Sequence, residues 1–203
     1  MKNTLIYLSF LLITVTSIAQ NKYVKELQNY QYKQNLLFHN KSTSPLIKED
    51  FKKFKALDFF TIDEKFRVIA TLTKTPDTPI FEMPTTTSRK PMYRKYGMLT
   101  FIMDGKEQQL EIYQSQELDI DPMYKDMLFL PFTDKTSGHE SYGGGRYIDV
   151  YTTDIKNEKI SIDFNKAYNP YCAYNERYSC PITPKQNHIT VPIKAGVKAF
   201  GNH

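Results

Sequence analysis

"MLTFIMDGKEQQLEIYQ", residues 98–114, is the stretch of this 203-residue sequence that decides the fold. Asp104-Gly105 stands at its centre, and an Asp-Gly pair is typical of the tight turn that joins two antiparallel strands. The stretch therefore predicts a β-hairpin with strands at Met98–Met103 and Lys106–Tyr113. It is the clearest structural signal in the chain.

Segments with strand patterns continue on both sides of this hairpin. The expected strands are residues 66–75, 127–132, 146–154 and 157–164, with residues 189–194 as a last candidate. Pro192 in that candidate favours the edge of a sheet, because proline has no backbone N–H to donate. Residues 146–154 and 157–164 look like one hairpin, so we expect Arg146 and Asp163 to be neighbours.

Helical patterns are confined to the first part of the chain. Residues 22–38 contain no glycine or proline and place four residues on one face: Tyr23, Leu27, Tyr30 and Leu37. Ser44-Pro45 could begin a short second helix that reaches Phe54. The predicted fold class is therefore mainly β or α+β: a curled antiparallel sheet, barrel- or sandwich-like, with the N-terminal helix packed outside.

The first residues, MKNTLIYLSFLLITVTSIAQ, have the pattern of a secretory signal peptide: a basic start, an apolar run and small residues before Ala19. The alternative, a membrane anchor, is disfavoured because the apolar run is shorter than the roughly 20 residues that span a bilayer. We expect export to the periplasm or the medium, without stable membrane insertion. The expected organisation is a signal peptide at 1–19, a helix and loop at 20–44, and one β-rich domain at 45–203.

The composition favours some partners over others. The formal net charge is +5, but the basic residues are scattered in pairs, whereas a nucleic-acid surface would gather them in a stripe. We therefore expect no nucleic-acid partner. Tyrosine is abundant, with 15 residues, and seven lie close together: Tyr142, Tyr147, Tyr151, Tyr168, Tyr171, Tyr174 and Tyr178. They suit either the wall of a ligand pocket or a core whose loops need polar anchors.

Two polar stretches carry the candidate site. In residues 131–150, three successive glycines could aim N–H groups at an anion, and Arg146 could bind a carboxylate or phosphate. The alternative is a tight loop whose Arg146 pairs with a structural aspartate. In residues 162–181, Asp163 and Asn165 share the face opposite Phe164. We expect one polar pocket whose ligand-binding residues are Thr136, Tyr142, Gly143, Gly145, Arg146, Asn165, Tyr168 and Asn169.

Both cysteines, Cys172 and Cys180, lie in the second stretch. In an exported protein two cysteines usually pair, and a disulfide closing this short loop would stabilise by about 2.5 kcal/mol in the chain-entropy model. Free buried thiols, a metal site with His188 and a catalytic cysteine are the alternatives. The spacing to His188 matches no common zinc pattern, so we expect no metal.

The two stretches, together with "FKALDFFTIDEKFRVIATL" upstream, resemble the bacterial family known as domain of unknown function 1684. The similarity covers about residues 45–200. The resemblance implies no activity, no cofactor and no residue role, because the family has none established. It places these residues in the family's characteristic blocks: Asp134, Thr136, Tyr142, Gly143, Gly145, Arg146, Asp163, Asn165, Tyr168, Asn169, Cys172 and Cys180.

The function expected from the residues is the binding of a small polar or anionic molecule in the cell envelope. A second hypothesis is a hydrolase in the same pocket, with Asp134 or Asp163 as general base and His139 nearby; Glu140 and Asp149 are further carboxylates that could form an acid/base pair. A third is a structural or protein-interaction module, whose protein partner the sequence does not identify. No cofactor is expected.

Overall fold

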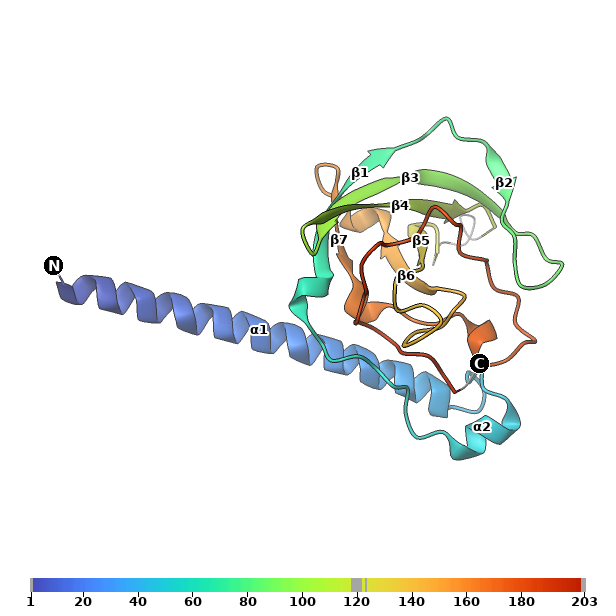
Figure 1. Cartoon of the computed structure of the whole chain (residues 1–203), viewed down its shortest axis with the longest axis horizontal. Coiled ribbons are helices and arrows are strands. Elements are labelled where there is room, and N and C mark those ends of the chain that lie inside the picture. The colour runs from blue at the N-terminus through green and yellow to red at the C-terminus, as the bar shows by residue number, and fades with distance from the viewer. Residues whose placement is uncertain (1, 118–121, 123, 202–203) are drawn as a thin grey trace.

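A curled antiparallel sheet forms the body of the molecule (Figure 1). The computed structural model describes residues 2–117, 122 and 124–201. The sheet order is β6-β5-β4-β3-β1-β7, with β2 paired to β3. The strands are β1 (Arg67–Lys74), β2 (Ile80–Glu82), β3 (Met92–Met103), β4 (Lys106–Ser115), β5 (Met127–Phe132), β6 (Arg146–Tyr151) and β7 (Lys159–Asp163). The predicted mainly β fold class is confirmed.

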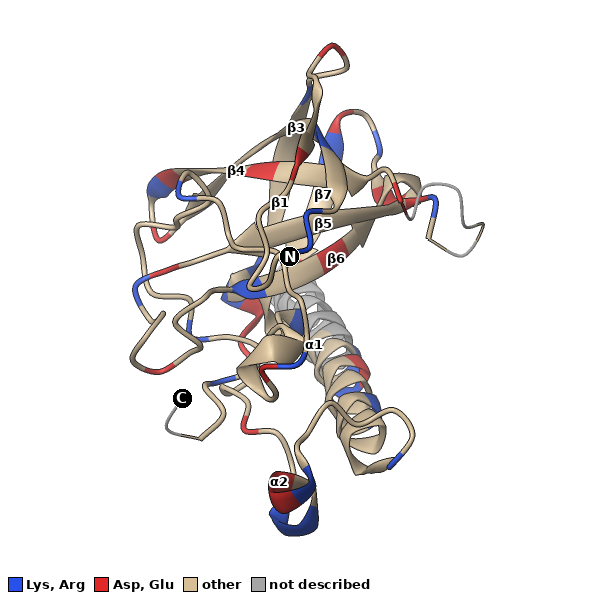
Figure 2. Ribbon diagram, turned by 90° about the vertical axis from the view of Figure 1, so that its right-hand side faces the viewer, with Lys and Arg blue, Asp and Glu red and all other residues tan. Residues whose placement is uncertain are grey.

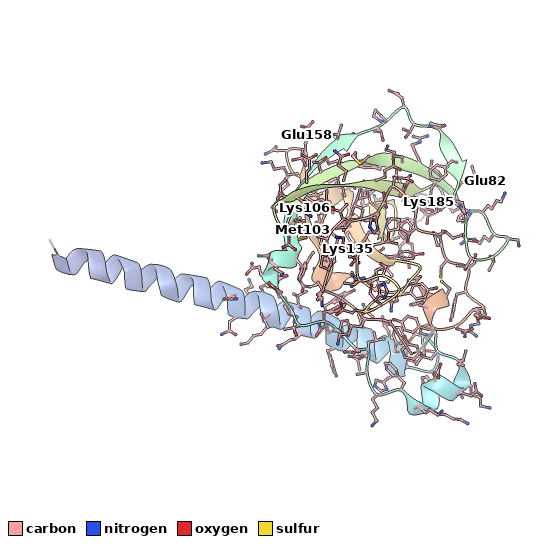
Figure 3. The ribbon with its side chains drawn as sticks, in the orientation of Figure 1. Glu82, Met103, Lys106, Lys135, Glu158 and Lys185 are labelled. Atoms are coloured by element: carbon pink, nitrogen blue, oxygen red, sulfur yellow. The ribbon has the colours of Figure 1, made fainter. Side chains whose placement is uncertain are left out.

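The hairpin expected at residues 98–114 is formed by β3 and β4. Asp104 and Gly105 both have positive φ angles, 49° and 72°, which the favoured two-residue hairpin turn requires. Met103 and Lys106 flank this turn as paired residues (Figure 3). β3 begins earlier than predicted, at Met92, and passes through a bulge before Gly97. A Cβ on Gly97 would lie 2.6 Å from the carbonyl oxygen of Thr73, so glycine lets β1 approach.

The expected hairpin of residues 146–163 is not formed. β6 pairs with β5, β7 pairs with β1, and the two strands stand at opposite ends of the sheet order. Alternation of residue types marks each strand as extended but does not specify its neighbour, which explains the wrong prediction. The two ends of the sheet nevertheless meet. Tyr168, just after β7, exchanges backbone hydrogen bonds of 2.9 and 3.0 Å with Tyr147 of β6.

The main core lies on the concave face of the sheet. Ile148 and Val150 of β6 point into it, together with apolar residues from every other long strand. Its open side is covered by the C-terminal segment, drawn in red in Figure 1, which buries Ile189, Val191 and Ile193. In Figure 3 side chains occupy the space between the sheet and this segment.

Residues 189–194 are not a strand, contrary to the prediction from their alternating pattern. The backbone N–H of Thr190 donates to the side chain of Gln108 at 2.9 Å, and that of Ile193 donates to the side chain of Asp134 at 3.0 Å. Pro192 has no N–H to donate. Side chains therefore replace the neighbouring strand as hydrogen-bond partners.

The helices lie outside the sheet, as predicted. α1 (Lys2–His39) contains the expected helix and buries Tyr23, Leu27 and Phe38 against the body. α2 (Lys48–Lys53) begins later than expected, without a side-chain cap, and carries both basic and acidic residues (Figure 2). Within the described part of the chain, no helix combines the length and the hydropathy needed to cross a membrane.

Asn187 joins β4 to β5 where the two strands diverge. These strands share a single register pair, Tyr113 with Phe129. The fully buried Asn187 side chain accepts from the N–H of Glu111 at 2.8 Å. It also donates to the carbonyl oxygens of Glu111 and Pro131, both at 2.7 Å. One side chain thus supplies the hydrogen bonds that the ladder lacks.

We expect Asn187→Ala to lower the free energy of unfolding by about 2–4 kcal/mol, because a buried backbone group without a partner costs about 1–3 kcal/mol. Urea denaturation measures this loss. The control is Lys185→Ala, an exposed position labelled in Figure 3, which should change stability by about 0.5 kcal/mol or less. Equal losses in the two variants would contradict the role of Asn187.

Candidate functional site

Arg146 lies in the core and does not line an open pocket. Its Nη2 donates to Oδ2 of Asp134 at 2.9 Å and to the carbonyl oxygen of Ile193 at 2.8 Å. Its Nη1 donates to the carbonyl oxygens of Ala195 and Val197. Both side chains of the ion pair are 0% exposed. The expectation that Arg146 holds a ligand beside Asn165 is therefore wrong, and the structure has the alternative, a pair with a structural aspartate.

The glycine loop is also occupied by internal contacts. The N–H of Gly145 donates to the carbonyl oxygen of Tyr142, and the carbonyl oxygen of Gly144 accepts from Thr183. Oδ1 of Asp134 accepts from the N–H of Thr136 at 2.8 Å. Gly145 is buried and Gly143 is exposed. The N–H groups of Thr136 and Gly145 are thus taken by the loop itself, so these two residues do not offer them to an anion.

A second network holds α1 against the end of β7. Asp163 accepts from the hydroxyl of Tyr23 at 3.1 Å and from the N–H of Asn165 at 3.0 Å. The amide of Asn165 donates to Tyr23 and to the carbonyl oxygen of Asp63. Asn169 donates to the carbonyl oxygen of Lys198 at 2.9 Å. Asn165 and Asn169, both predicted to bind ligand, are 2% exposed and serve to fix chain segments.

These contacts bear on the predicted catalytic residues as well. Asp134 is fully buried and committed to Arg146 and to two backbone N–H groups, so it is not placed to accept a proton from a substrate. Asp163 is half-buried and holds Tyr23 and Asn165. His139 is exposed, on the glycine loop. The three residues do not form one network.

A pocket that is open to solvent on one side lies instead on the convex face of β4, β5 and β6. Because strand residues alternate, Tyr147, Asp149 and Tyr151 point away from the core that Ile148 and Val150 enter. α1 and the segment that follows β7 cover this face. The pocket has a volume of about 740 Å³. Eight tyrosines line it: Tyr30, Tyr93, Tyr124, Tyr147, Tyr151, Tyr168, Tyr171 and Tyr178.

Two contacts fix the cover of this pocket. The hydroxyl of Tyr30 in α1 donates to the carbonyl oxygen of Lys166 at 2.8 Å. The hydroxyl of Tyr147 donates to the carbonyl oxygen of Pro181. The rings of Tyr147 and Tyr168 meet edge to face, with centroids 5.9 Å apart. The walls are thus held by hydrogen bonds at their rims and by ring contacts behind them.

Asp149 is the acidic residue of this pocket. Its side chain is exposed to the pocket, and partial desolvation by the surrounding protein raises its pKa. The hydroxyl of Tyr168 donates to Oδ1 at 2.8 Å, which lowers the pKa in part. None of the ion pairs among the described residues includes Asp149. A carboxylate held in this way is a candidate for binding a cation or for accepting a proton.

Another depression of about 740 Å³ lies on the other side of α1, beside Tyr23, Arg67 and Asp163. Five of its lining residues are lysine or arginine and three are aspartate or glutamate. Water already solvates such a surface, and binding pockets are mostly apolar with few polar groups. We therefore take the Asp149 pocket as the candidate site. Of the predicted ligand-binding residues, Tyr168 lines it.

One of the two cysteines, Cys180, stands in the wall of the Asp149 pocket, and Cys172 lies behind it. Cys180 is buried and lines the pocket, and its sulfur accepts from the N–H of Cys172 at 3.2 Å. Both are free thiols. A hydrogen bond from Cys180 lowers the pKa of Cys172, and the same contact raises that of Cys180. Burial, and then Cys172, raises the pKa of Tyr142 to about 12, which places Tyr142 beside this pair.

We expect Asp134→Ala to lower the free energy of unfolding by about 3–5 kcal/mol, because it leaves the Arg146 charge buried without a partner. The control is Glu140→Ala, which breaks the exposed pair with Lys194 and should cost about 1 kcal/mol or less. Chemical denaturation of both variants measures the difference. If Asp134→Ala were as mild as the control, the ion pair would not hold the C-terminal segment.

Comparison with known proteins identifies the family of this chain but assigns no function to the pocket. The family model described as "Protein of unknown function (DUF1684)" matches residues 52–198. The solution NMR structure of an uncharacterised protein from Haloarcula marismortui is 31% identical, covering 89% of this chain and 96% of that chain, with a TM-score of 0.69. No curated protein matches the sequence. The chain therefore belongs to the DUF1684 family of proteins of unknown function.

Proposed function

We propose that this protein binds a small organic molecule in the Asp149 pocket. The observation that carries the proposal is the pocket itself: an aromatic-walled hollow of about 740 Å³ with an unpaired carboxylate open to it. Small-molecule sites have this size and this balance of apolar wall and few polar groups. Because Arg146 is buried among internal partners, the charged groups that the described wall offers to a guest are the carboxylate of Asp149 and the exposed amine of Lys166.

A second candidate is a hydrolase in the same pocket. Asp149, and neither Asp134 nor Asp163, would be the general base, because it is exposed in the pocket and desolvation raises its pKa. The neighbouring thiols of Cys172 and Cys180 would be candidate nucleophiles. The binding function has the stronger support, since it needs only the pocket and its walls.

We also propose that the protein is exported and that Cys172 and Cys180 pair in the oxidising compartment. The apolar start of the chain supports export. The contact of 3.2 Å between the N–H of Cys172 and the sulfur of Cys180 supports pairing, because it brings the two residues into contact. Removal of residues 1–19 would leave α1 from Gln20 onwards, with Tyr23 and Leu27 still available to pack on the body.

The pocket is tested by blocking it. Gln34 of α1 lines the pocket, so Gln34→Trp should fill part of the space, whereas Tyr32→Trp changes an exposed residue of the same helix that does not line it. We expect a panel of small ring-bearing molecules to contain a compound that raises the melting temperature of the wild type and of Tyr32→Trp. A ligand at 100 times its Kd stabilises by about 2.7 kcal/mol. Gln34→Trp should lose that response.

Two outcomes would contradict the proposal. One is that no compound of any charge class stabilises the wild type. The other is that stabilisation survives in Gln34→Trp, which would place the binding site elsewhere.

Export and pairing are tested in one measurement, the intact mass of the protein recovered from the periplasm or the medium. We expect a chain that begins at Gln20 and lacks two hydrogen atoms, and that gains them on treatment with a reductant. Cys180→Ser should keep the cleavage and lose the effect of the reductant. An uncleaved chain would rule out the signal peptide, and a fully reduced exported chain would rule out the disulfide.

A further inference from the structure

We propose that the ligand of the Asp149 pocket is an organic cation, an alkylammonium or quaternary ammonium compound. Its charged group would lie against the Asp149 carboxylate, and its carbon substituents would lie against the tyrosine rings. This proposal rests on the proposed function and adds the chemical class of the ligand.

The charge of the pocket is the first argument. Among the described residues, Asp149 and Lys166 are the charged ones in its wall. Lys166 is exposed, takes part in no ion pair among the described residues, and also borders the neighbouring depression next to Asp163. The Asp149 carboxylate is exposed to the pocket, and no ion pair among the described residues gives it a counter-charge. A guest cation would supply that counter-charge.

The rings are the second argument. A cation is attracted to the face of an aromatic ring within about 6 Å of its centre, and quaternary ammonium groups are bound in this way. In this wall Tyr147 stands nearly perpendicular to both Phe129 and Tyr168, at 82° and 85°. These rings pack against each other and are mostly buried, and the more exposed rings of the same wall are those of Tyr124, Tyr151 and Tyr171. The exposed rings could contact the methyl substituents of a compact cation.

The hydrogen bonds of the wall are the third argument. The hydroxyl of Tyr147 donates to the carbonyl oxygen of Pro181, and that of Tyr168 donates to Oδ1 of Asp149. Among the described residues, no hydrogen bond to Oδ2 of Asp149 is found. The wall therefore offers a guest ring surface and one carboxylate oxygen, and an anion would meet that carboxylate.

The test compares choline with 3,3-dimethylbutan-1-ol, which has the same shape with carbon in place of the charged nitrogen. Isothermal titration calorimetry on the purified protein should give choline an affinity at least about tenfold higher, since a desolvated cation–π contact is worth about 2 kcal/mol. Asp149→Asn, which keeps the shape and removes the charge, should abolish that preference. Circular dichroism checks that this variant folds.

Lys166→Met distinguishes the sign of the ligand. If the ligand is a cation, removing this like charge leaves the affinity for choline unchanged or increases it. If the pocket selects anions, the same change weakens binding of a carboxylate such as benzoate.

The outcomes separate the two proposals. Equal binding of choline and its neutral isostere, lost in Gln34→Trp, would overturn the cation and leave the pocket as a binding site. No binding of choline or of the larger benzyltrimethylammonium at millimolar concentration would also overturn it. The proposed function then fails only through its own two outcomes: no compound of the panel stabilises the protein, or stabilisation survives in Gln34→Trp.

Discussion

The buried ion pair between Arg146 and Asp134 is the interaction on which the rest of the structure depends. Moving two charges out of water costs several kcal/mol for each, and excellent geometry with further hydrogen bonds must offset that cost. Here the guanidinium binds Asp134 and three carbonyl groups of the C-terminal segment, and the carboxylate binds two N–H groups. This segment, which forms no strand, is thereby held over the open side of the sheet, where it completes the core.

Local patterns in the sequence predict much of the fold because they act over a few residues. The Asp104-Gly105 turn, the strand at residues 127–132 and the helix at residues 22–38 are each set by neighbours along the chain, and the structure has all three. Pairing between distant strands is a different matter. Whether β7 joins β6 or β1 depends on how the sheet curls, and residues 189–194 look like a strand although side chains take their hydrogen bonds.

The candidate site shows the same division. The alternation of strand side chains could have placed Asp149 on the outer face of β6, because Ile148 and Val150 on either side of it enter the core. Tyr147 and Tyr151 lie on the same face as Asp149. Arg146 was misplaced because a sequence does not tell a buried arginine from one that lines a pocket. Loops rich in glycine and polar residues serve binding in many proteins. Here the ends of the loop between Asp134 and Arg146 are buried and bind internal partners. The tyrosines of the Asp149 pocket line the accessible surface instead.

The backbone hydrogen bonds between Tyr147 and Tyr168, here called the seam, have a consequence for local opening of the curled sheet. Tyr147 belongs to β6, at one end of the sheet order, and Tyr168 follows β7, at the other end. The hydrogen bonds of the seam can therefore break without disturbing the long ladder of β3 and β4. The side chain of Tyr168 also touches Asp149 inside the pocket. Local opening of this seam would therefore also move the Tyr168 hydroxyl away from the Asp149 carboxylate.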